Sequence, residues 1–335
     1  MAVKMRKSVL LLLSLPLLVA ACGGADEGGA PARSAAAERP VVVATTTQLG
    51  DIVRQVAGDA ADVHQVLQAN TDPHEYEPRP DDVKAVAGAK VVFESGNELD
   101  HWMEEMVEQA GGNPVEVAIA PDHTPHKVEG EHHEEGEEGG DEHGGEESEF
   151  DPHWWHDPRN VEAAIGVIEA ELTKAAPANA ATYKANAAAY VKQVQTLDQG
   201  IETCMSSVPA AERKLVTSHD AFGYFTARYG VTVVGAAIPS QSTEAQPSAG
   251  EIAKLAAVVR REGVKAVFPE SSINPQLAET LARQTGAKAD YVLYGDSLGP
   301  EGSPGATYLG MEAANADAMV KGFTGGERGC AIAGL

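Results

Sequence analysis

The chain has 335 residues, with 50 acidic against 25 basic side chains and a formal net charge of −25. Phosphate binding needs a basic face, so this balance argues against a nucleic-acid partner. The length that follows residue 39 is sufficient for two modest lobes or one large α/β domain.

The N-terminal residues predict export and a membrane anchor. A short basic region precedes an almost entirely apolar run at residues 9–20, which is too short to span a bilayer comfortably. Residues 1–21 are therefore interpreted as a signal peptide. Small residues directly before Cys22 resemble the lipobox of bacterial lipoproteins and imply lipidation of this cysteine, although an ordinary cleavage site is the alternative. Residues 22–39 then form a flexible tether, and the folded part is expected to be extracytoplasmic and lipid-anchored to the cell membrane.

Short β-branched runs alternate with helical patterns in the segment that follows the tether. Strands are expected at 41–44, 63–67, 91–93 and 115–118, and helices at 49–56, 80–87 and 97–109. This alternation predicts a parallel α/β sheet.

A strongly acidic insert interrupts the pattern. Between Asp122 and Asp151 there are 13 carboxylates against one lysine, so the segment has too few apolar residues to bury a core and is expected to be disordered. A merely solvated acidic loop is the alternative. Histidine-rich tracts are typical of metal binding, which favours an auxiliary low-affinity metal loop. Its five histidines are His123, His126, His132, His133 and His143.

An alanine-rich stretch without a strand pattern runs from residue 158 to about residue 205. Pro177 divides it, and a helix over 178–204 would be about 40 Å long, enough to join two lobes. The alternation then resumes. Strands are expected at 214–217, 231–234, 265–268 and 290–293, and helices at 220–229, 248–261, 274–284 and 310–322.

The predicted fold class is therefore α/β. We expect two lobes, each a mainly parallel sheet flanked by helices, joined by one long interlobe helix. The predicted boundaries are 40–177 for the N-terminal lobe, with the loop 121–150 inside it, 178–205 for the connecting helix and 206–335 for the C-terminal lobe.

Two cysteines remain once Cys22 is assigned to lipid. An exported protein can keep a disulfide, so the compartment favours a bridge between Cys204 and Cys330. Two separately buried thiols are the alternative.

Four side chains stand at strand ends or in the loops next to the expected elements, where open parallel sheets bind ligands. Taken singly, each is readily a capped turn or a surface histidine. Taken together, three imidazoles and one carboxylate match the usual ligands of zinc. The four are His74, His153, His219 and Asp296.

The segments around these residues resemble the zinc- and manganese-type solute-binding proteins of ABC importers. The matching motifs are DPHEYEP at 72–78, DPHWWHDP at 151–158, TSHDAFGYF at 217–225 and GDSLG at 295–299. In that family the metal lies between two α/β lobes, so the resemblance implies a metal in the interlobe cleft with these four ligands. It also implies delivery to an ABC permease and its ATPase by a monomeric binding subunit that is not an enzyme.

Two further residues near these motifs leave alternatives open. His153, directly after Asp-Pro, is the ligand that the family motif implies, which leaves His156 as a partner behind the ligands or a surface residue. Glu270 follows the strand expected at 265–268 and is either a hydrogen-bond partner behind the ligands or a carboxylate at a helix start.

The ligand types favour Zn²⁺ as the captured ion, because imidazole suits zinc whereas manganese favours oxygen donors. The resemblance supports this, since manganese-type members tend to have a carboxylate where this chain has His219. The alternatives are a manganese or iron carrier of the same architecture, a passive zinc buffer or adhesin, and an envelope zinc hydrolase. The hydrolase is disfavoured because the sequence lacks His-Glu-x-x-His, and because four protein ligands leave no position for water.

Overall fold

The computed structural model describes residues 38–130 and 149–335. The signal peptide, Cys22 and most of the tether lie outside these ranges, as do His132, His133 and His143. Within the described ranges, no helix combines the length and the hydropathy needed to cross a bilayer.

The first sheet has four parallel strands in the order β2-β1-β3-β4. Its strands are β1 (Val41–Ala44), β2 (Asp62–Gln65), β3 (Val91–Gly96) and β4 (Val115–Ala120). The helices between them are α1 (Thr47–Ala57), α2 (Pro80–Gly88) and α3 (Trp102–Ala110). The predicted alternation of strands and helices is therefore confirmed in this part of the chain.

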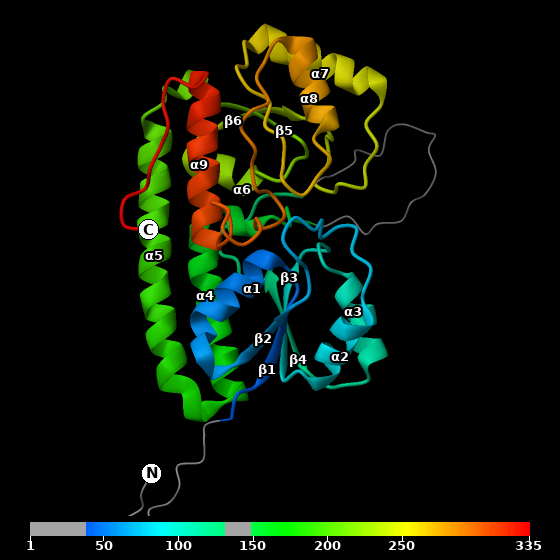
Figure 1. Ribbon diagram of the computed structural model, residues 1–335, viewed down its shortest axis with the longest axis vertical. Coiled ribbons are helices and arrows are strands. Elements are labelled where there is room, and N and C mark those ends of the chain that lie inside the picture. The colour runs from blue at the N-terminus through cyan, green and yellow to red at the C-terminus, as the bar shows by residue number, and fades with distance from the viewer. Residues whose placement is uncertain (1–37, 131–148) are drawn as a thin grey trace, which may run out of the picture. The chain divides into compact units, whose positions relative to one another are not determined.

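Both faces of this sheet are covered, which explains why its central strands are apolar along their length. Val42 and Phe93 point to one face and pack in the largest core cluster, which α1 also enters. Val43 and Val92 point to the opposite face and pack against α2 and α3. Figure 1 shows α1 on one side of the sheet and α2 with α3 on the other.

The second sheet pairs β5 (Lys214–Thr217) with β6 (Thr232–Ala236) in parallel. The segment expected as a strand at 265–268 joins β5 through an isolated parallel bridge, Thr217 to Phe268. The segment expected at 290–293 does not reach β5 but lies beside the first one, through the bridge from Glu270 to Leu293. Pro269 interrupts the ladder because it has no N–H to donate, so the extended conformation is present without a regular strand. Helices α6 (Gly223–Tyr229), α7 (Ala249–Glu262), α8 (Gln276–Thr285) and α9 (Tyr308–Thr324) surround this sheet.

A long helix connects the two sheets. After α4 (Pro158–Ala175) and a short turn at Pro177–Asn179, α5 runs over 27 residues, Ala180–Ser206. One face of α5 is buried at helical spacing, including Tyr183, Tyr190 and Leu197. Figure 1 shows α5 running alongside both α4 and α9. The long helix predicted from the sequence is present, shifted by two residues.

The two sheets share one hydrophobic core cluster. It contains Phe93 of β3 together with Phe268 and Leu293 of the second sheet, and α5 contributes to it throughout. The lobe boundaries predicted from the sequence stay a prediction, because this packing is continuous across them.

The helix expected over 97–109 begins later, at Trp102. Asn97 and Glu98 have left-handed φ values of 52° and 62°, which do not continue a helix. The Asp100 carboxylate accepts hydrogen bonds from the backbone N–H groups of Ser95 and Gly96 and so stabilises the turn instead.

Cys204, near the end of α5, and Cys330, in the tail after α9, form a disulfide with a Cα–Cα distance of 5.7 Å. The bridge closes a sequence separation of 126 residues. It fixes the C-terminal tail to the same helix that joins the two sheets.

Candidate metal centre

Four segments that are distant in sequence bring their polar side chains to one point. His74 lies in the loop after β2, His153 directly precedes the short helix η2 (Trp154–His156), His219 follows β5, and Asp296 follows the extended segment that ends at Leu293. Each offers one ligand atom, and these four atoms all lie within 4.8 Å of one another. The structure thus brings together all four residues that the sequence analysis predicted as ligands.

The side chains of the cluster are in close contact with one another. His153 Nε2 lies 3.2 Å from Asp296 Oδ1, and His219 Nε2 lies 3.2 Å from Asp296 Oδ2. The two imidazole Nε2 atoms are 3.4 Å apart. His74 is placed less tightly, with its Nε2 3.9 Å from Asp296 Oδ2.

The cluster is almost fully shielded from solvent. His153 and His219 have no exposed surface, Asp296 is 1% exposed, and the His74 side chain is 8% exposed. Among the described residues, His74 Nε2 and both Asp296 carboxylate oxygens are buried without a well-formed hydrogen bond. Unsatisfied buried polar atoms are costly, and a cation among them would satisfy all three.

Buried carboxylates hold two of the imidazoles from behind. Asp151 Oδ1 accepts a hydrogen bond from the His153 backbone N–H at 2.9 Å and lies 2.7 Å from Nδ1. Glu270 Oε1 does the same for His219, at 2.9 Å from the backbone nitrogen and 3.0 Å from Nδ1. A carboxylate at Nδ1 fixes the tautomer and orients Nε2 toward a metal.

Two glycines make room for these carboxylates. A Cβ atom on Gly223 would clash with Asp151 Oδ2, and a Cβ atom on Gly295 would clash with Glu270 Oε2. Gly295 directly precedes Asp296, so the close approach of Glu270 also brings the fourth residue of the cluster into place.

Sequence reasoning named Glu270 as one of two possibilities and missed Asp151. A signal for Asp151 was present, because Asp-Pro-His occurs twice, at 72–74 and at 151–153. In both copies the aspartate accepts a hydrogen bond from the backbone N–H of the histidine two residues later. Only Asp151 also reaches the imidazole.

The electrostatics of the metal-free cluster divide the histidines into two kinds. Burial lowers the pKa of His74 to about 3, an effect that the nearby Asp296 only partly offsets. Burial also opposes protonation of His153, but Asp151 and then Asp296 outweigh it and raise the pKa to about 9. Burial is likewise outweighed at His219, where Asp296 and then Glu270 raise the pKa well above its usual value.

Asp296 is the negative centre of the cluster. Burial would raise the pKa of its carboxyl group, but His219 and His153 outweigh this and hold the pKa well below its usual range. A permanent carboxylate enclosed by imidazole nitrogens is a favourable position for a divalent cation.

The remaining candidate residues lie outside the cluster. His156 is completely buried and lies beside Glu312 rather than beside the four ligand atoms. His123 is exposed and His126 is half-buried, and neither belongs to the four-residue set. A metal-binding role for the histidine-rich segment stays a prediction.

The fold and this site define a class: two-lobed α/β proteins that bind a metal ion as the substrate-binding component of an ABC transporter, and that are not enzymes. Within this class, the chain belongs to the family described as the periplasmic zinc-uptake complex component A, whose model matches residues 42–322.

Individual relatives carry the names of several metals. The manganese-binding lipoprotein MntA of Halalkalibacterium halodurans is 30% identical over 309 residues, covering 92% of this chain and 95% of that protein. The iron-binding protein YfeA of Yersinia pestis is 32% identical over 282 residues, covering 84% of this chain and 86% of that protein.

Among solved structures, the periplasmic zinc-binding protein TroA of Treponema pallidum superposes with a TM-score of 0.75 at 28% identity, covering 85% of this chain and 99% of that one. These likenesses establish a metal-binding protein of the ABC-transporter class without deciding between zinc, manganese and iron.

Proposed function

We propose that this chain captures Zn²⁺ outside the cytoplasm and delivers it to the permease of an ABC importer, which a partner ATPase drives. The observation that carries the choice of metal is the donor set, in which three imidazoles and a single carboxylate converge within 4.8 Å. Zinc is commonly held by four such ligands in a tetrahedron, whereas manganese favours sites richer in oxygen.

His219 is the residue on which this choice depends most. Manganese-type members of the family that the sequence resembles tend to have a carboxylate at this position, and here an imidazole lies 3.2 Å from Asp296. Glu270 behind His219 supports its role as a metal ligand, because the pair is fully buried and points Nε2 at the cluster.

Competition titration of the metal-free protein tests the proposal. We expect Zn²⁺ to bind at least about 100-fold more tightly than Mn²⁺, since the Irving–Williams order and the nitrogen-rich donors act in the same direction. Tighter binding of Mn²⁺ than of Zn²⁺ would overturn the choice of zinc.

A manganese or iron carrier of the same architecture is the second candidate function. The names of the relatives favour it, since two proteins that are 30% and 32% identical are named for manganese and iron. The same titration, extended to Fe²⁺ under anaerobic conditions, favours this second candidate if Mn²⁺ or Fe²⁺ binds more tightly than Zn²⁺.

Delivery to a transporter is separable from metal binding. We propose a monomer that is anchored to the cell membrane through lipidated Cys22, which the lipobox-like sequence and the naming of relatives as lipoproteins support. Growth of a deletion strain under zinc chelation tests the import role. Normal zinc uptake in that strain would favour a passive zinc buffer instead.

The histidine-rich segment is proposed as a second, weaker tier of zinc binding. Its described ends lie together, because Gly130 N–H donates to the carbonyl of Glu149 at 2.9 Å and Glu129 pairs with Phe150. Deleting residues 131–148 therefore removes three of the five histidines at a point where the chain can be rejoined. We expect fewer zinc ions bound per protein, measured by titration with elemental analysis, and an unchanged affinity at the tight site. Loss of the tight site on deletion would contradict this division.

A further inference from the structure

The short helix η2 follows His153 directly, and its three side chains contact three different parts of the protein. Trp154 Nε1 donates to Ser95 Oγ at the end of β3 at 2.9 Å. Trp155 Nε1 donates to the carbonyl of Gly295 at 3.1 Å, one residue before Asp296. The His156 side chain contacts α9 instead.

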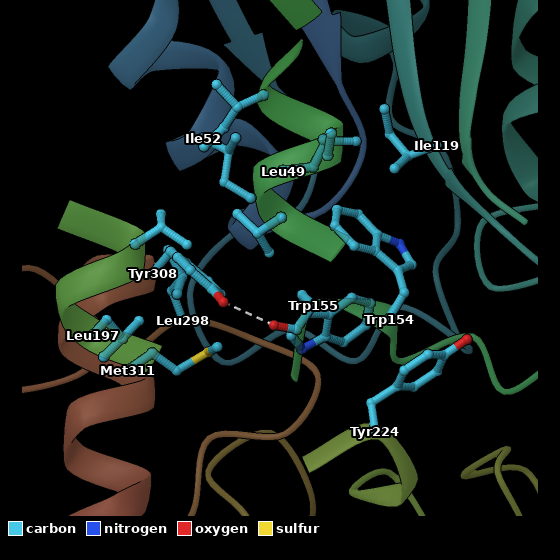
Figure 2. Packing of buried hydrophobic residues seen from close by; sticks show 14 of the residues in the cluster. Leu49, Ile52, Ile119, Trp154, Trp155, Leu197, Tyr224, Leu298, Tyr308 and Met311 are labelled. Carbon is cyan, nitrogen blue, oxygen red and sulfur yellow. Dashed lines mark hydrogen bonds between the residues drawn. The ribbon is translucent and has the colours of Figure 1, made fainter. Parts of the chain in front are cut away.

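Helix α9 holds η2 at two points. The Tyr308 hydroxyl donates to the backbone carbonyl of Trp155 at 2.9 Å, as the dashed line in Figure 2 shows. One turn further along α9, Glu312 Oε1 lies 2.7 Å from His156 Nδ1. Glu312 and His156 both have no exposed surface, so this contact is made entirely inside the protein.

His156 also connects η2 to the segment of a second histidine. Its ring stacks on Phe222, with ring centroids 4.5 Å apart and an interplanar angle of 26°. Phe222 lies three residues after His219, at the start of α6. Helix η2 therefore follows His153 directly, and it contacts the segment of His219 through His156 and the segment of Asp296 through Trp155.

We propose that His156 and Glu312 are positioning residues for the metal centre. Resting on the proposed metal-binding function, this inference adds a role for two residues that belong to none of the four ligands. The bond between them adds to the contacts that hold η2, and so helps to place the backbone of His153, whose imidazole Asp151 orients. Through Phe222 and Trp155 it sets the segments of His219 and Asp296.

The chemistry of the pair supports positioning over stabilisation. A buried charged or polar pair must be desolvated, and replacing such a pair with apolar side chains of similar volume is often neutral for stability or better. What an apolar pair lacks is direction, because only a hydrogen bond fixes the angle of the imidazole relative to α9. Among the described residues, His156 Nε2 and Glu312 Oε2 have no hydrogen-bond partner, so the bond between Nδ1 and Oε1, together with the stacking on Phe222, sets their arrangement.

His74 provides the contrast. Its loop is held by the Asp72 carboxylate, which accepts from His74 N–H at 3.0 Å, and by Trp102 Nε1, which donates to the carbonyl of Pro73 at 3.0 Å. These contacts come from its own loop and from α3, and none of them involves η2 or α9. The proposed positioning therefore applies to three of the four ligands.

The double variant His156→Leu/Glu312→Leu tests the proposal, because it removes the directional bond without leaving either group unpaired in the core. Zinc affinity and the rate of zinc dissociation to a strong chelator are measured beside the melting temperature of the metal-free protein. We expect a melting temperature near that of the wild type, together with binding about 10- to 100-fold weaker and correspondingly faster dissociation. A folded double variant with wild-type affinity and dissociation rate would overturn the proposal.

Two further variants complete the experiment. Glu312→Gln keeps an acceptor for His156 Nδ1 and should bind zinc within about threefold of the wild type, whereas equal losses in Gln and Leu variants would contradict positioning by this bond. Tyr183→Phe is the matched control, since it removes a buried hydrogen bond to the carbonyl of Ala60 that has no contact with η2.

Should the double variant fail to fold, Phe222→Leu decides, because it loosens the stacking contact without unpairing a polar group. We then expect a measurable loss of affinity, and wild-type affinity would overturn the proposal. Absence of zinc or manganese binding by the wild-type protein would overturn the proposed function itself. Zinc binding by the wild-type protein, together with unchanged zinc affinity in the variants, would overturn only the positioning role of His156 and Glu312.

Discussion

Replacing His219 with alanine is expected to weaken zinc binding by roughly 10²- to 10³-fold. Structural zinc sites with four ligands contribute about 10–16 kcal/mol, so one ligand accounts for a few kcal/mol, and each 1.4 kcal/mol is a factor of ten. His219→Ala also leaves the buried Glu270 carboxylate without its imidazole partner. Both effects reduce affinity. Competition with a chromophoric chelator measures the change.

His64→Ala is the matched control for this variant. His64 also has a carboxylate partner, with Nε2 3.0 Å from Asp82 Oδ1, but it lies on β2 and outside the four-residue cluster. We expect wild-type zinc affinity for it. A loss below about threefold in His219→Ala would contradict the assignment of this residue as a ligand.

The order of elements was predictable from the sequence because it depends on local patterns. Short β-branched runs predicted the four strands of the first sheet, and the alanine-rich stretch without a strand pattern predicted the long helix. The irregular second sheet was less predictable. Its segments around Phe268 and Leu293 are extended, yet Pro269 breaks the hydrogen-bond ladder that would make them strands.

The start of α3 shows how a tertiary contact overrides a helical pattern. The pattern extends back to Asn97, but Asn97 adopts a left-handed conformation and its side chain donates to the carbonyl of Asp151 at 3.3 Å. This contact joins residues 54 positions apart and reaches the chain two residues before His153. A local reading of residues 97–101 contains no sign of it.

The four candidate ligands were accessible from sequence because each stands in a motif that resembles a known family. Of the residues behind them, Glu270 and His156 were named from sequence as possibilities, but without a partner for either. The bond between His156 and Glu312 joins positions 156 residues apart, and Glu312 sits in a helix whose pattern gives no indication of a buried partner. What a single sequence hides at this site is therefore the set of contacts behind the ligands, which only the folded arrangement of η2 and α9 defines.

Zinc binding at pH 7 is expected to release up to about two protons. In the metal-free protein, His153 has a pKa of about 9 and the pKa of His219 is raised well above its usual value, which favours the doubly protonated, charged form of both rings at neutral pH. Imidazole must be neutral at its ligating nitrogen, and each ion bound therefore displaces these protons. His74 contributes none, because its pKa of about 3 leaves it neutral throughout this range.

The sign of the pH dependence follows from this competition. Affinity should rise with pH, by up to roughly 100-fold per unit while both protons must be displaced, and the slope should decrease as pH approaches 9. Histidines whose folded-state pKa is raised stabilise the metal-free protein below about pH 6.5 and lose that contribution as pH rises through about 9. The increase in melting temperature caused by zinc should therefore grow between pH 6.5 and 9.

Calorimetric titration at pH 7 in two buffers of different ionisation enthalpy measures the number of protons released. His74→Ala is the control, since it should weaken binding without changing that number. Release of fewer than about half a proton per zinc ion would contradict this prediction, because it would mean that His153 and His219 are already neutral before the metal binds.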